Sequence, residues 1–363
     1  MGVERIRFVL SRQLEELPVD RQQWNALVAE TAGTSVFQTY EWFESWWTAL
    51  GGKNELFVVT MWDGEALLGI APLMIERHRG LRYLEFVGSP NADYQDFILG
   101  PQPEVVLKGL ATFLADQRNA WHMMALRNLS TESITSRKLP GLLNATRIDT
   151  IDDERIACPT LEIASQSEEV RRRVNAYSFR RRIRRLSSLG ELKFTRCSTT
   201  AELERYLPQF FAQYSEQRAG SAAARFLGRS EVGEFYSALA RAMLPQGWLH
   251  FSVLECDRRP VSFHFGFEFS GRLYWYKPCY DPALARMSPG KVLLSYLIRD
   301  ALDSNLDELD FTVGAEPFKY RFTRTQRTNV TLRAFSSRWL YQSFRGVAWA
   351  RRQLSSRSGS GSQ

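Results

Sequence analysis

The sequence has few cysteines and histidines, and neither residue type is clustered. Four cysteines and four histidines are spread over 363 residues, and no two cysteines form a CxxC pair. Isolated thiols are typical of a reducing compartment. The spacing of these residues matches no metal-binding pattern. We therefore expect no disulfide framework and no metal cofactor.

Long apolar runs are also missing. The longest one, Leu67–Ile75, is far shorter than the roughly 20 residues that a membrane-spanning helix needs. The chain opens on the charged segment Met1–Leu10, whereas a signal peptide has a basic tip followed by an apolar stretch. These features predict a cytoplasmic protein.

The composition is that of a globular protein. Hydrophobic residues make up 44% of the chain and charged residues 24%, values that exclude a disordered chain. Because single cores stop growing well below this length, 363 residues predict two domains. Aromatic residues reach 13%, and such side chains either fill cores or line binding clefts.

Positive charge is concentrated in one segment. The net charge is +7, and Arg171–Arg185 (RRRVNAYSFRRRIRR) holds eight arginines in fifteen residues. One interpretation is a solvated helix face. The other is a docking surface for the phosphates of a cofactor, a nucleotide-linked substrate, an RNA or a lipid headgroup, since arginine binds planar anions with a fork of donors. On that interpretation Arg181 and Arg182 contact the substrate; we do not expect DNA as the partner.

The two halves of the chain show a similar order of elements. Leu56–Ile75 and Leu249–Phe269 each read as a long hairpin that follows helices and precedes a further strand. Two copies of one fold would explain this order, although any two meanders look alike. The predicted fold class is α/β (α+β), each domain being a mixed, mostly antiparallel sheet flanked by helices. The join is expected near Thr150–Pro159.

The segment Val261–Lys319 reads as strand, strand, loop, helix and strand. A helix start exposes unpaired N–H groups that bind a pyrophosphate. Ser288, Pro289 and Gly290 suit such a start, because Ser caps, Pro fits the first turn and Gly admits a close ligand. Arg286 and Lys291 would add charge to this cofactor site. This order of elements can hold a thioester cofactor, and we would then expect its pantetheine arm between the strands Val261–Phe269 and Arg272–Tyr280.

Candidate catalytic residues come from the same segment. Alternation along Val261–Phe269 predicts a polar face that carries His264, which titrates near neutrality and is either a general base or a structural histidine. Glu316 is a second candidate base, with Lys319 as its partner or as a clamp for a substrate anion. Tyr274 and Tyr276 share one strand face. In an acyl transfer from a thioester either could protonate the leaving thiolate; otherwise they pack in the core.

At these residues the sequence resembles a known family. PVSFHFGFEFSGRLYWYKPCYDPALARMSPGKVLLSYLIRDAL, followed by LDFTVGAEPFKYRF, is similar to the GNAT-type acyltransferases associated with bacterial cellulose and exopolysaccharide synthesis. The resemblance extends to FRRRIRRLSSLG, FQTYEWFESWW and DGEALLGIAPL. That family is related to the Fem-type aminoacyltransferases, which carry two GNAT folds in tandem. The sequence departs from the family pattern at Ala315, where an acidic residue is common, and at Phe318, where Tyr is common.

The resemblance implies an organisation and an activity. It implies a degenerate GNAT-like domain over 1–155, a catalytic one over 156–336, and a basic, partly flexible tail over 337–363. The implied donor is acetyl-CoA or a longer acyl-CoA, and the implied acceptor is an amine or hydroxyl of a sugar, a glycolipid or another envelope precursor. Tyr274, Tyr276, Tyr280 and Asp281 match the Tyr-rich strand of the family, with Tyr280 and Asp281 on the substrate. Glu316 and Lys319 match its terminal motif.

Other functions stay open. The Arg-rich segment would also suit an aminoacyl-tRNA-dependent transferase, and a basic protein at an anionic membrane would suit N-acylation of an amino lipid. A non-catalytic partner of a polysaccharide synthase is a further class. If the two domains form a cleft, Trp46 and Asp93 are expected on its acceptor side, although Trp46 also suits a core.

The tail mixes aromatic residues with arginine at roughly helical spacing over Trp339–Arg352. Such a segment either docks on the body of the protein or lies on a membrane surface. The end, Ser358–Gln363, is expected to be flexible. If the tail lies on a membrane surface, we expect a cytoplasmic protein that contacts the inner face of the membrane.

Overall fold

The computed structural model describes residues 6–221 and 229–346, which form two compact units. Of the described residues, unit 1 combines 6–40, 53–155 and 329–346, and unit 2 combines 41–52, 156–221 and 229–328. Within the described residues, no helix is both long enough and apolar enough to cross a membrane.

Unit 1 is a mostly antiparallel sheet with helices. Its strands follow the order β1-β2-β3-β4-β6-β13, in which only β4 and β6 are parallel to each other. The elements are β1 (Arg7–Ser11), α1 (Arg21–Glu30), β2 (Glu55–Asp63), β3 (Ala66–His78), β4 (Leu81–Phe86), β5 (Ile98–Leu99), α3 (Pro103–Asp116), β6 (Met123–Ser130), α4 (Ile134–Ala145) and the end of β13 (Gln326–Phe335).

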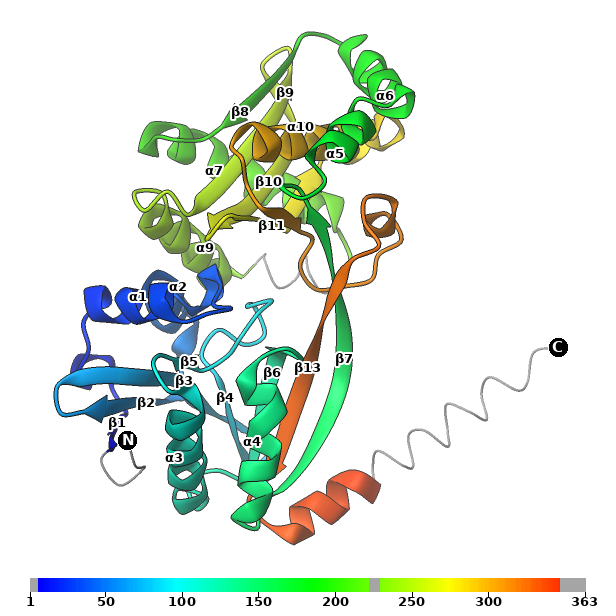
Figure 1. The fold of residues 1–363 in the computed structure, drawn as a ribbon. Helices are drawn as coiled ribbons and strands as arrows, with labels where there is room; N and C mark the ends of the chain where they lie inside the picture. Colours follow the sequence, from blue (N-terminus) through cyan, green and yellow to red (C-terminus); the bar gives the residue numbers. More distant parts are fainter. Residues whose placement is uncertain (1–5, 222–228, 347–363) are drawn as a thin grey trace. The chain divides into compact units, whose positions relative to one another are not determined.

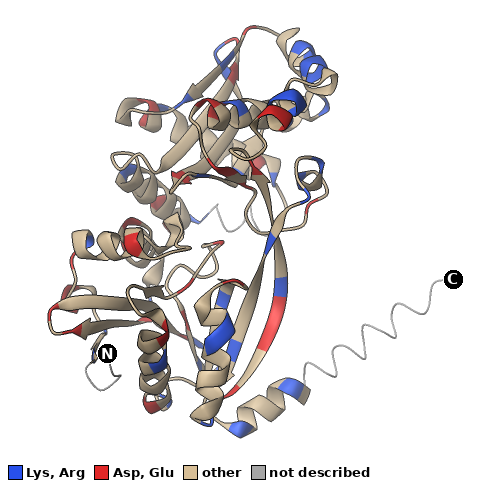
Figure 2. Cartoon of the chain, in the orientation of Figure 1, with Lys and Arg blue, Asp and Glu red and all other residues tan. Residues whose placement is uncertain are grey.

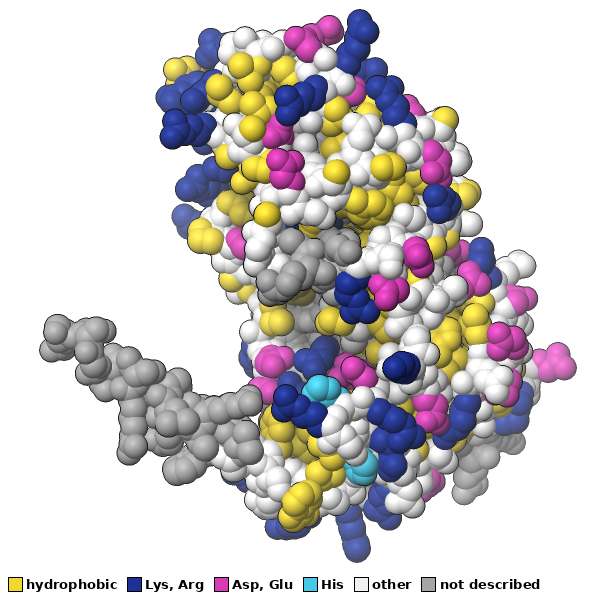
Figure 3. All heavy atoms as spheres, turned by 180° about the vertical axis from the view of Figure 1, so that it is seen from behind, with side chains coloured by type: hydrophobic (Ala, Val, Ile, Leu, Met, Phe, Trp, Pro, Cys, Tyr) yellow, Lys and Arg dark blue, Asp and Glu magenta, His cyan; other side chains and the backbone are white. Residues whose placement is uncertain are grey.

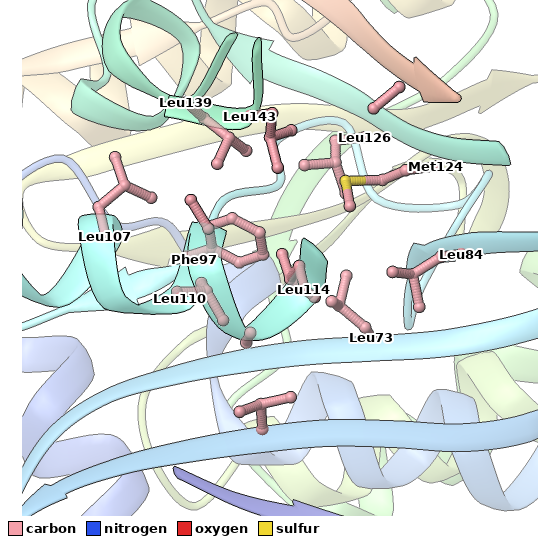
Figure 4. Packing of buried hydrophobic residues seen from close by; sticks show 14 of the residues in the cluster. Leu73, Leu84, Phe97, Leu107, Leu110, Leu114, Met124, Leu126, Leu139 and Leu143 are labelled. Carbon is pink, nitrogen blue, oxygen red and sulfur yellow. The ribbon is translucent and has the colours of Figure 1, made fainter. Parts of the chain in front are cut away.

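The core of unit 1 lies between the sheet and two helices (Figure 4). Leu107, Leu110 and Leu114 share one face of α3 because they are three and four residues apart. They are fully buried, together with Leu139 and Leu143 of α4. Each such side chain contributes about 1.5–3 kcal/mol by leaving water, so the amphipathic pattern fixes both helices on the sheet.

Unit 2 has the same plan. Its strand order is β7-β12-β11-β10-β9-β8, and only β11 and β12 are parallel. The elements are α2 (Tyr40–Trp46) with a π-helical turn (Trp47–Gly51), β7 (Asp149–Glu162), α5 (Ser167–Val174), α6 (Tyr177–Ser187), β8 (Leu192–Arg196), α7 (Thr200–Gln217), α9 (Ser230–Met243), β9 (Leu249–Cys256), β10 (Arg259–Phe269), β11 (Arg272–Tyr280), the 3-10 turn η5 (Pro282–Met287), α10 (Pro289–Asp303), β12 (Glu308–Asp310) and the 3-10 turn η6 (Lys319–Arg321).

The two faces of the unit 2 sheet bury different side chains. Phe263 and Phe265 of β10 pack on Phe210 of α7. On the other face, Val261 and Leu273 join the side chains of α10 in one core cluster. The pairing of β10 with β9 is irregular between Pro260 and Ser262, and this irregularity accounts for the division. The predicted apolar face of Val261–Phe269 therefore holds for its phenylalanines, whereas Val261 lies with α10.

The predicted fold class is confirmed: both units are mixed α/β structures with mostly antiparallel sheets and flanking helices (Figure 1). The Arg-rich segment forms two helices, α5 and α6, where the sequence predicts one. The helix α4 was not predicted, because Pro140 interrupts its pattern. The short strand β5, Ile98–Leu99, pairs with β3.

The expected join near Thr150–Pro159 contains the boundary between the two units, which falls between Arg155 and Ile156. It lies inside β7, a strand of 14 residues that continues from unit 1 into unit 2. The strand β13 returns from unit 2 to unit 1 in the same way. Residues 329–335 therefore complete the first sheet, and residues 41–52 belong to unit 2. The compact units thus differ at these segments from the expected ranges 1–155 and 156–336.

The described part of the tail packs on unit 1. Residues 338–346 are helical, and the rings of Tyr341 and Phe344 lie 5.7 and 5.2 Å from the ring of Phe335. Trp339 is 73% exposed. Docking therefore accounts for Tyr341 and Phe344, whereas the remainder of Trp339–Arg352 and the end Ser358–Gln363 lie outside the described residues.

Candidate functional site

Strands β11 and β12 separate after a short paired stretch. They pair from Arg272 opposite Glu308 to Tyr274 opposite Asp310. Beyond that point the chain after β12 follows β7 instead, because Phe311 N–H donates to the Pro159 carbonyl at 3.0 Å and Gly314 N–H to the Ala157 carbonyl at 2.9 Å. We call the region between Trp275–Tyr280 and Phe311–Gly314 the fork.

A buried lysine holds one side of the fork. Lys319 is 3% exposed, and its Nζ donates to the carbonyls of Val313 at 2.9 Å and Gly314 at 3.1 Å. It also reaches the Thr312 carbonyl at 3.4 Å and pairs with Glu316 at 2.8 Å. An ammonium has three donors, and all of them are used within the loop. Lys319 therefore shapes this loop and is the partner of Glu316, the first of its two predicted roles. Its other predicted role, as a clamp for a substrate anion, is corrected because its donors are all used.

Glu316 is the accessible member of that pair. Its side chain is 56% exposed, and a Cβ atom added to Gly314 would lie 2.7 Å from its Oε2. Gly314 also has a φ of +112°, a conformation that L-residues rarely adopt. The segment from Gly314 to Lys319 therefore builds a compact turn that presents the carboxylate of Glu316 to solvent beside the fork.

Strand β11 carries a bulge at the start of the fork. The β10–β11 register shifts between Phe265 and Phe267, which leaves an extra β11 residue opposite Gly266. His264 Nε2 donates to the Tyr274 carbonyl at 3.2 Å, and its ring stacks on Trp275 at 4.9 Å. A Cβ atom on Gly266 would lie 2.2 Å from the His264 ring and 2.3 Å from the Tyr274 oxygen. His264 and Gly266 thus fit together around the bulge.

This environment changes the interpretation of His264. The side chain is fully buried, and within the described residues its Nδ1 has no hydrogen-bond partner. Burial, followed by the neighbouring His250, holds the pKa of His264 well below its usual value, although the bond to Tyr274 opposes the shift. A neutral imidazole without solvent contact has no route to a substrate proton. The proposal that His264 is the general base is therefore corrected to a structural role at the bulge.

A pH measurement would test this role. Below pH 6.5 the unfolded chain protonates this histidine and the folded chain does not, so stability falls as the pH drops from 6.5, by up to about 1.4 kcal/mol per pH unit. His264→Gln keeps an amide donor for the carbonyl but cannot titrate. We expect urea unfolding between pH 7.5 and 5 to show a flatter profile for His264→Gln. His250, Asp300 and Arg196 are common to both proteins, so identical pH profiles would contradict the buried neutral state.

The two candidate tyrosines lie on the face of β11 opposite Trp275. Tyr276 Oη is 3.0 Å from Tyr236 Oη, and its ring lies 6.0 Å from Trp42 of α2. Tyr274 is fully buried, and burial raises the pKa of its phenol. The positive charge of Arg272 acts against this shift. Tyr276 is slightly exposed, at 7%, and is therefore the better placed of the two to meet a ligand.

The helix α10 begins beside the far end of β11. Ser288 precedes it in a left-handed conformation, and its carbonyl accepts from the N–H groups of Lys291 and Val292. Its hydroxyl makes no capping bond. Pro289 occupies the first turn, and the Cβ of a residue at Gly290 would lie 3.3 Å from the Tyr280 ring. A side chain at position 290 would therefore lie against Tyr280 of β11, and glycine leaves this space beside the helix start open.

Three cations gather at this helix start. Burial lowers the pKa of Lys291, and the nearby charges of Arg182 and Arg321 lower it further. Arg182 comes from α6 and Arg321 from η6. Such mutual repulsion is relieved when an anion binds. We call Arg182, Lys291 and Arg321 the cationic cluster. Figure 2 marks the basic positions along α5 and α6 in blue, and Figure 3 shows basic side chains gathered at one edge of the surface.

The structure distinguishes between Arg181 and Arg182, the two arginines predicted to contact the substrate. Arg182 is partly buried and stacks over Phe179 at 5.6 Å, whereas Arg181 is exposed and is not among the charges that act on Lys291. Sequence reasoning missed Arg321, although it lies two residues after Lys319 in the same motif.

The other nominated residues have separate surroundings. Asp281 caps η5 through the Ala283 N–H and pairs with Arg259 at 2.8 Å, which makes it structural. Arg286 is exposed on η5. Trp46 is buried in unit 2. Asp93 belongs to unit 1, where its carbonyl accepts from Asn329 Nδ2. The role of Trp46 and Asp93 at an acceptor site stays a prediction.

The expected position of a pantetheine arm needs correction. Strands β10 and β11 are paired from Ser262 opposite Tyr280 to Phe269 opposite Arg272. Paired neighbours lie about 4.8 Å apart, which leaves no room for a ligand between them. The unpaired edge of β11 faces the fork, and the fork is therefore the opening that this strand offers.

Unit 1 contains a counterpart of this site with different chemistry. Gln102 precedes α3 with φ 58° and ψ 52°, nearly the 57° and 49° of Ser288, and Pro103 follows it. However, Glu104 stands where α10 has Gly290, and it pairs with Lys138 at 3.8 Å. Beyond the β4–β6 pairing, Asn128 of β6 bonds to Gln95 and Ala92. Unit 1 thus has an acidic helix start. The segment with Ala92 and Gln95 lies along β6 at the position that corresponds to the fork of unit 2.

Comparison with known proteins agrees with this geometry. Residues 171–320 match the model of a family described as an acetyltransferase (GNAT) domain. This range contains β11, the helix start of α10, β12 and Lys319. No curated protein matches the chain.

Solved structures with a similar fold cover nearly the whole chain. FemX superposes with a TM-score of 0.60 at 10% identity, over 90% of this chain and 98% of FemX. The C-terminal domain of a putative lysylphosphatidylglycerol synthetase from Agrobacterium fabrum gives 0.53 at 10% identity, over 86% and 90%. A tandem GNAT protein from the clavulanic acid biosynthesis pathway gives 0.50 at 12% identity, over 92% and 99%. The chain therefore has a GNAT-like fold and carries an acyltransferase domain.

Proposed function

Because residues 171–320 match an acetyltransferase (GNAT) domain, we propose that the chain transfers an acyl group from acetyl-CoA or a longer acyl-CoA. The acceptor is an amine or hydroxyl of a sugar, a glycolipid or another envelope precursor. One observation carries the choice of donor: the charges of Arg182 and Arg321 act on Lys291, which lies beside Gly290 in the first turn of α10. Two phosphates at a helix N-terminus are favoured both by the exposed N–H groups and by these charges.

The fork then receives the pantetheine arm. The edge of β11 after Tyr274 has no paired strand on the β12 side. Side chains of Thr312, Arg218 and Gln217 already bond the Trp275 carbonyl, the Pro278 carbonyl and the Tyr280 N–H. An amide-containing arm would hydrogen-bond the remaining backbone groups as an added strand does. This arrangement brings the thioester toward the bulge at Trp275 and Tyr276. The role of His264 is to hold that bulge.

Glu316 is the proposed general base. It takes a proton from the acceptor while the acceptor nitrogen or oxygen forms a bond to the acyl carbon and the carbon–sulfur bond breaks. Tyr276 is the proposed acid that returns a proton to the departing thiolate. Glu316 is suited to this task because it is exposed beside the fork, whereas His264 and Tyr274 are fully buried.

A second donor class has a specific observation in its favour. FemX and the putative lysylphosphatidylglycerol synthetase share the fold over most of the chain. The family that the sequence resembles is related to the Fem-type aminoacyltransferases, which take an aminoacyl group from tRNA. The arginines of α5 and α6 would suit RNA phosphates. An envelope precursor would meet either enzyme at the inner membrane face, where a basic protein is attracted to anionic lipids.

Ligand-dependent thermal stability separates these donors. We expect CoA and acetyl-CoA at about 100 times their Kd to stabilise the pure protein by about 2.7 kcal/mol, because a ligand stabilises the state that it binds. Charged tRNA at matched phosphate concentration should give no larger shift than uncharged tRNA. Stabilisation by charged tRNA but not by CoA would overturn the acyl-CoA proposal in favour of aminoacyl transfer.

A further inference from the structure

A polar pocket of about 600 Å³ lies in unit 2 beside the cationic cluster. Gln166, Glu169 and Arg173 form one wall, at and just before α5, and the segment 320–325 forms the other. Arg321 belongs both to this lining and to the cluster. The volume is within the range of pockets that hold a nucleotide-sized ligand.

The walls of the pocket are fixed by internal bonds. Arg173 bridges Glu169 on its own helix and the carbonyl of Phe322 on the opposite wall. Thr323 Oγ1 donates to the Thr160 carbonyl at 2.6 Å, and this bond anchors the segment to β7. Because these bonds tie α5 and the segment to their neighbours, the pocket is present before any ligand arrives.

Two arginines of the pocket are uncommitted. Within residues 6–221 and 229–346, neither the Arg321 nor the Arg324 guanidinium makes a hydrogen bond or an ion pair, and both residues are exposed. By contrast, Arg173 and Glu169 neutralise each other. Each free guanidinium offers a planar fork of donors that matches a phosphate.

An aromatic ring stands next to them. Tyr320 is 39% exposed, and its hydroxyl donates to Gln326 Oε1 at 2.9 Å, which restrains the ring. A restrained, exposed ring offers a face on which a base can stack. Phosphate-binding arginines together with a stacking face are the chemistry that recognises a phosphorylated nucleoside.

We propose that this pocket binds the 3′-phosphoadenosine end of coenzyme A, with Tyr320 against the adenine and Arg324 on the 3′-phosphate. The proposal rests on the proposed acyl-CoA donor and adds the part of the donor that is recognised. Arg321, between the pocket and the start of α10, would contact the neighbouring pyrophosphate. The pocket thus selects a donor that carries a phosphate on its ribose.

Calorimetric titration with CoA and 3′-dephospho-CoA tests this assignment. The wild-type protein is expected to bind CoA about tenfold or more tighter than dephospho-CoA, as one charge-assisted pair implies. Arg324→Ala should weaken CoA binding by that factor and leave dephospho-CoA binding unchanged. Arg324→Lys should retain part of the preference. Arg182→Ala should weaken both ligands equally, and Lys193→Ala, which removes an exposed cation on β8, should change neither.

The outcomes separate this pocket from the function itself. Two outcomes would overturn the assignment of the 3′-phosphoadenosine to this pocket and leave the CoA donor in place. One is equal affinity of the wild-type protein for CoA and dephospho-CoA. The other is a loss of affinity in Arg324→Ala that is the same for both ligands. Failure of the wild-type protein to bind either ligand would overturn the donor as well. If Arg324→Ala reduced binding of charged tRNA while CoA did not bind, the pocket would belong to an RNA end. Unchanged melting temperatures of the variants exclude unfolding as the cause.

Discussion

Gly290→Val is expected to remove measurable CoA binding, a loss of more than a hundredfold or about 2.8 kcal/mol. The Cβ atom alone would lie 3.3 Å from the Tyr280 ring, and the two methyl groups of valine would then occupy the approach to the Gly290 N–H. A pyrophosphate needs that approach, because the donors at a helix start are backbone groups. Calorimetry with CoA measures the loss directly.

The folded state should survive this change. Gly290 is not among the glycines with positive φ, and valine in a helix costs less than about 1 kcal/mol. The matched control is Gly233→Val in α9, where an added Cβ meets no atom within 4 Å. That variant should keep wild-type affinity. Gly290→Ala should give an intermediate affinity. CoA binding by Gly290→Val at the wild-type level would exclude the start of α10 as the phosphate site.

Local sequence patterns were sufficient to locate this helix start and the strands before it. Ser288, Pro289 and Gly290 follow rules of helix termini that depend only on neighbouring residues. Alternation along β10 likewise identified the polar set that includes His264 and Gly266. These signals are short in range, and the structure retains them because tertiary packing follows the same periodicity.

The remaining features depend on contacts between distant segments. The exchange of β7 and β13 between the units comes from pairings that no local pattern encodes. The bulge shifts the register by one residue, and that single residue leaves His264 facing a carbonyl and not a ligand. Which of Arg181 and Arg182 joins the cluster depends on how α6 packs. Arg321 had a usable signal, since a second cation follows Lys319 in the terminal motif.

Lys319→Met is expected to destabilise unit 2 by about 1–3 kcal/mol for each partly buried carbonyl that loses its donor. The change leaves the carbonyls of Val313 and Gly314 without their donor and removes the only described partner of Glu316. With the loop released, one side of the fork is no longer held. CoA affinity should therefore fall together with the urea midpoint.

Glu316→Gln separates the structural contribution of this pair from its catalytic one. Because Glu316 is 56% exposed, its ion pair is screened and contributes at most about 1 kcal/mol. Glu316→Gln should thus fold and bind CoA nearly as the wild type does, while its kcat falls about a hundredfold or more for loss of a general base. Lys319→Gln, which retains an amide donor for the carbonyls, should be more stable than Lys319→Met. If Lys319→Met were as stable as the wild type, the loop would not depend on this ammonium. An unchanged kcat in Glu316→Gln would remove Glu316 as the base without affecting the structural role of Lys319.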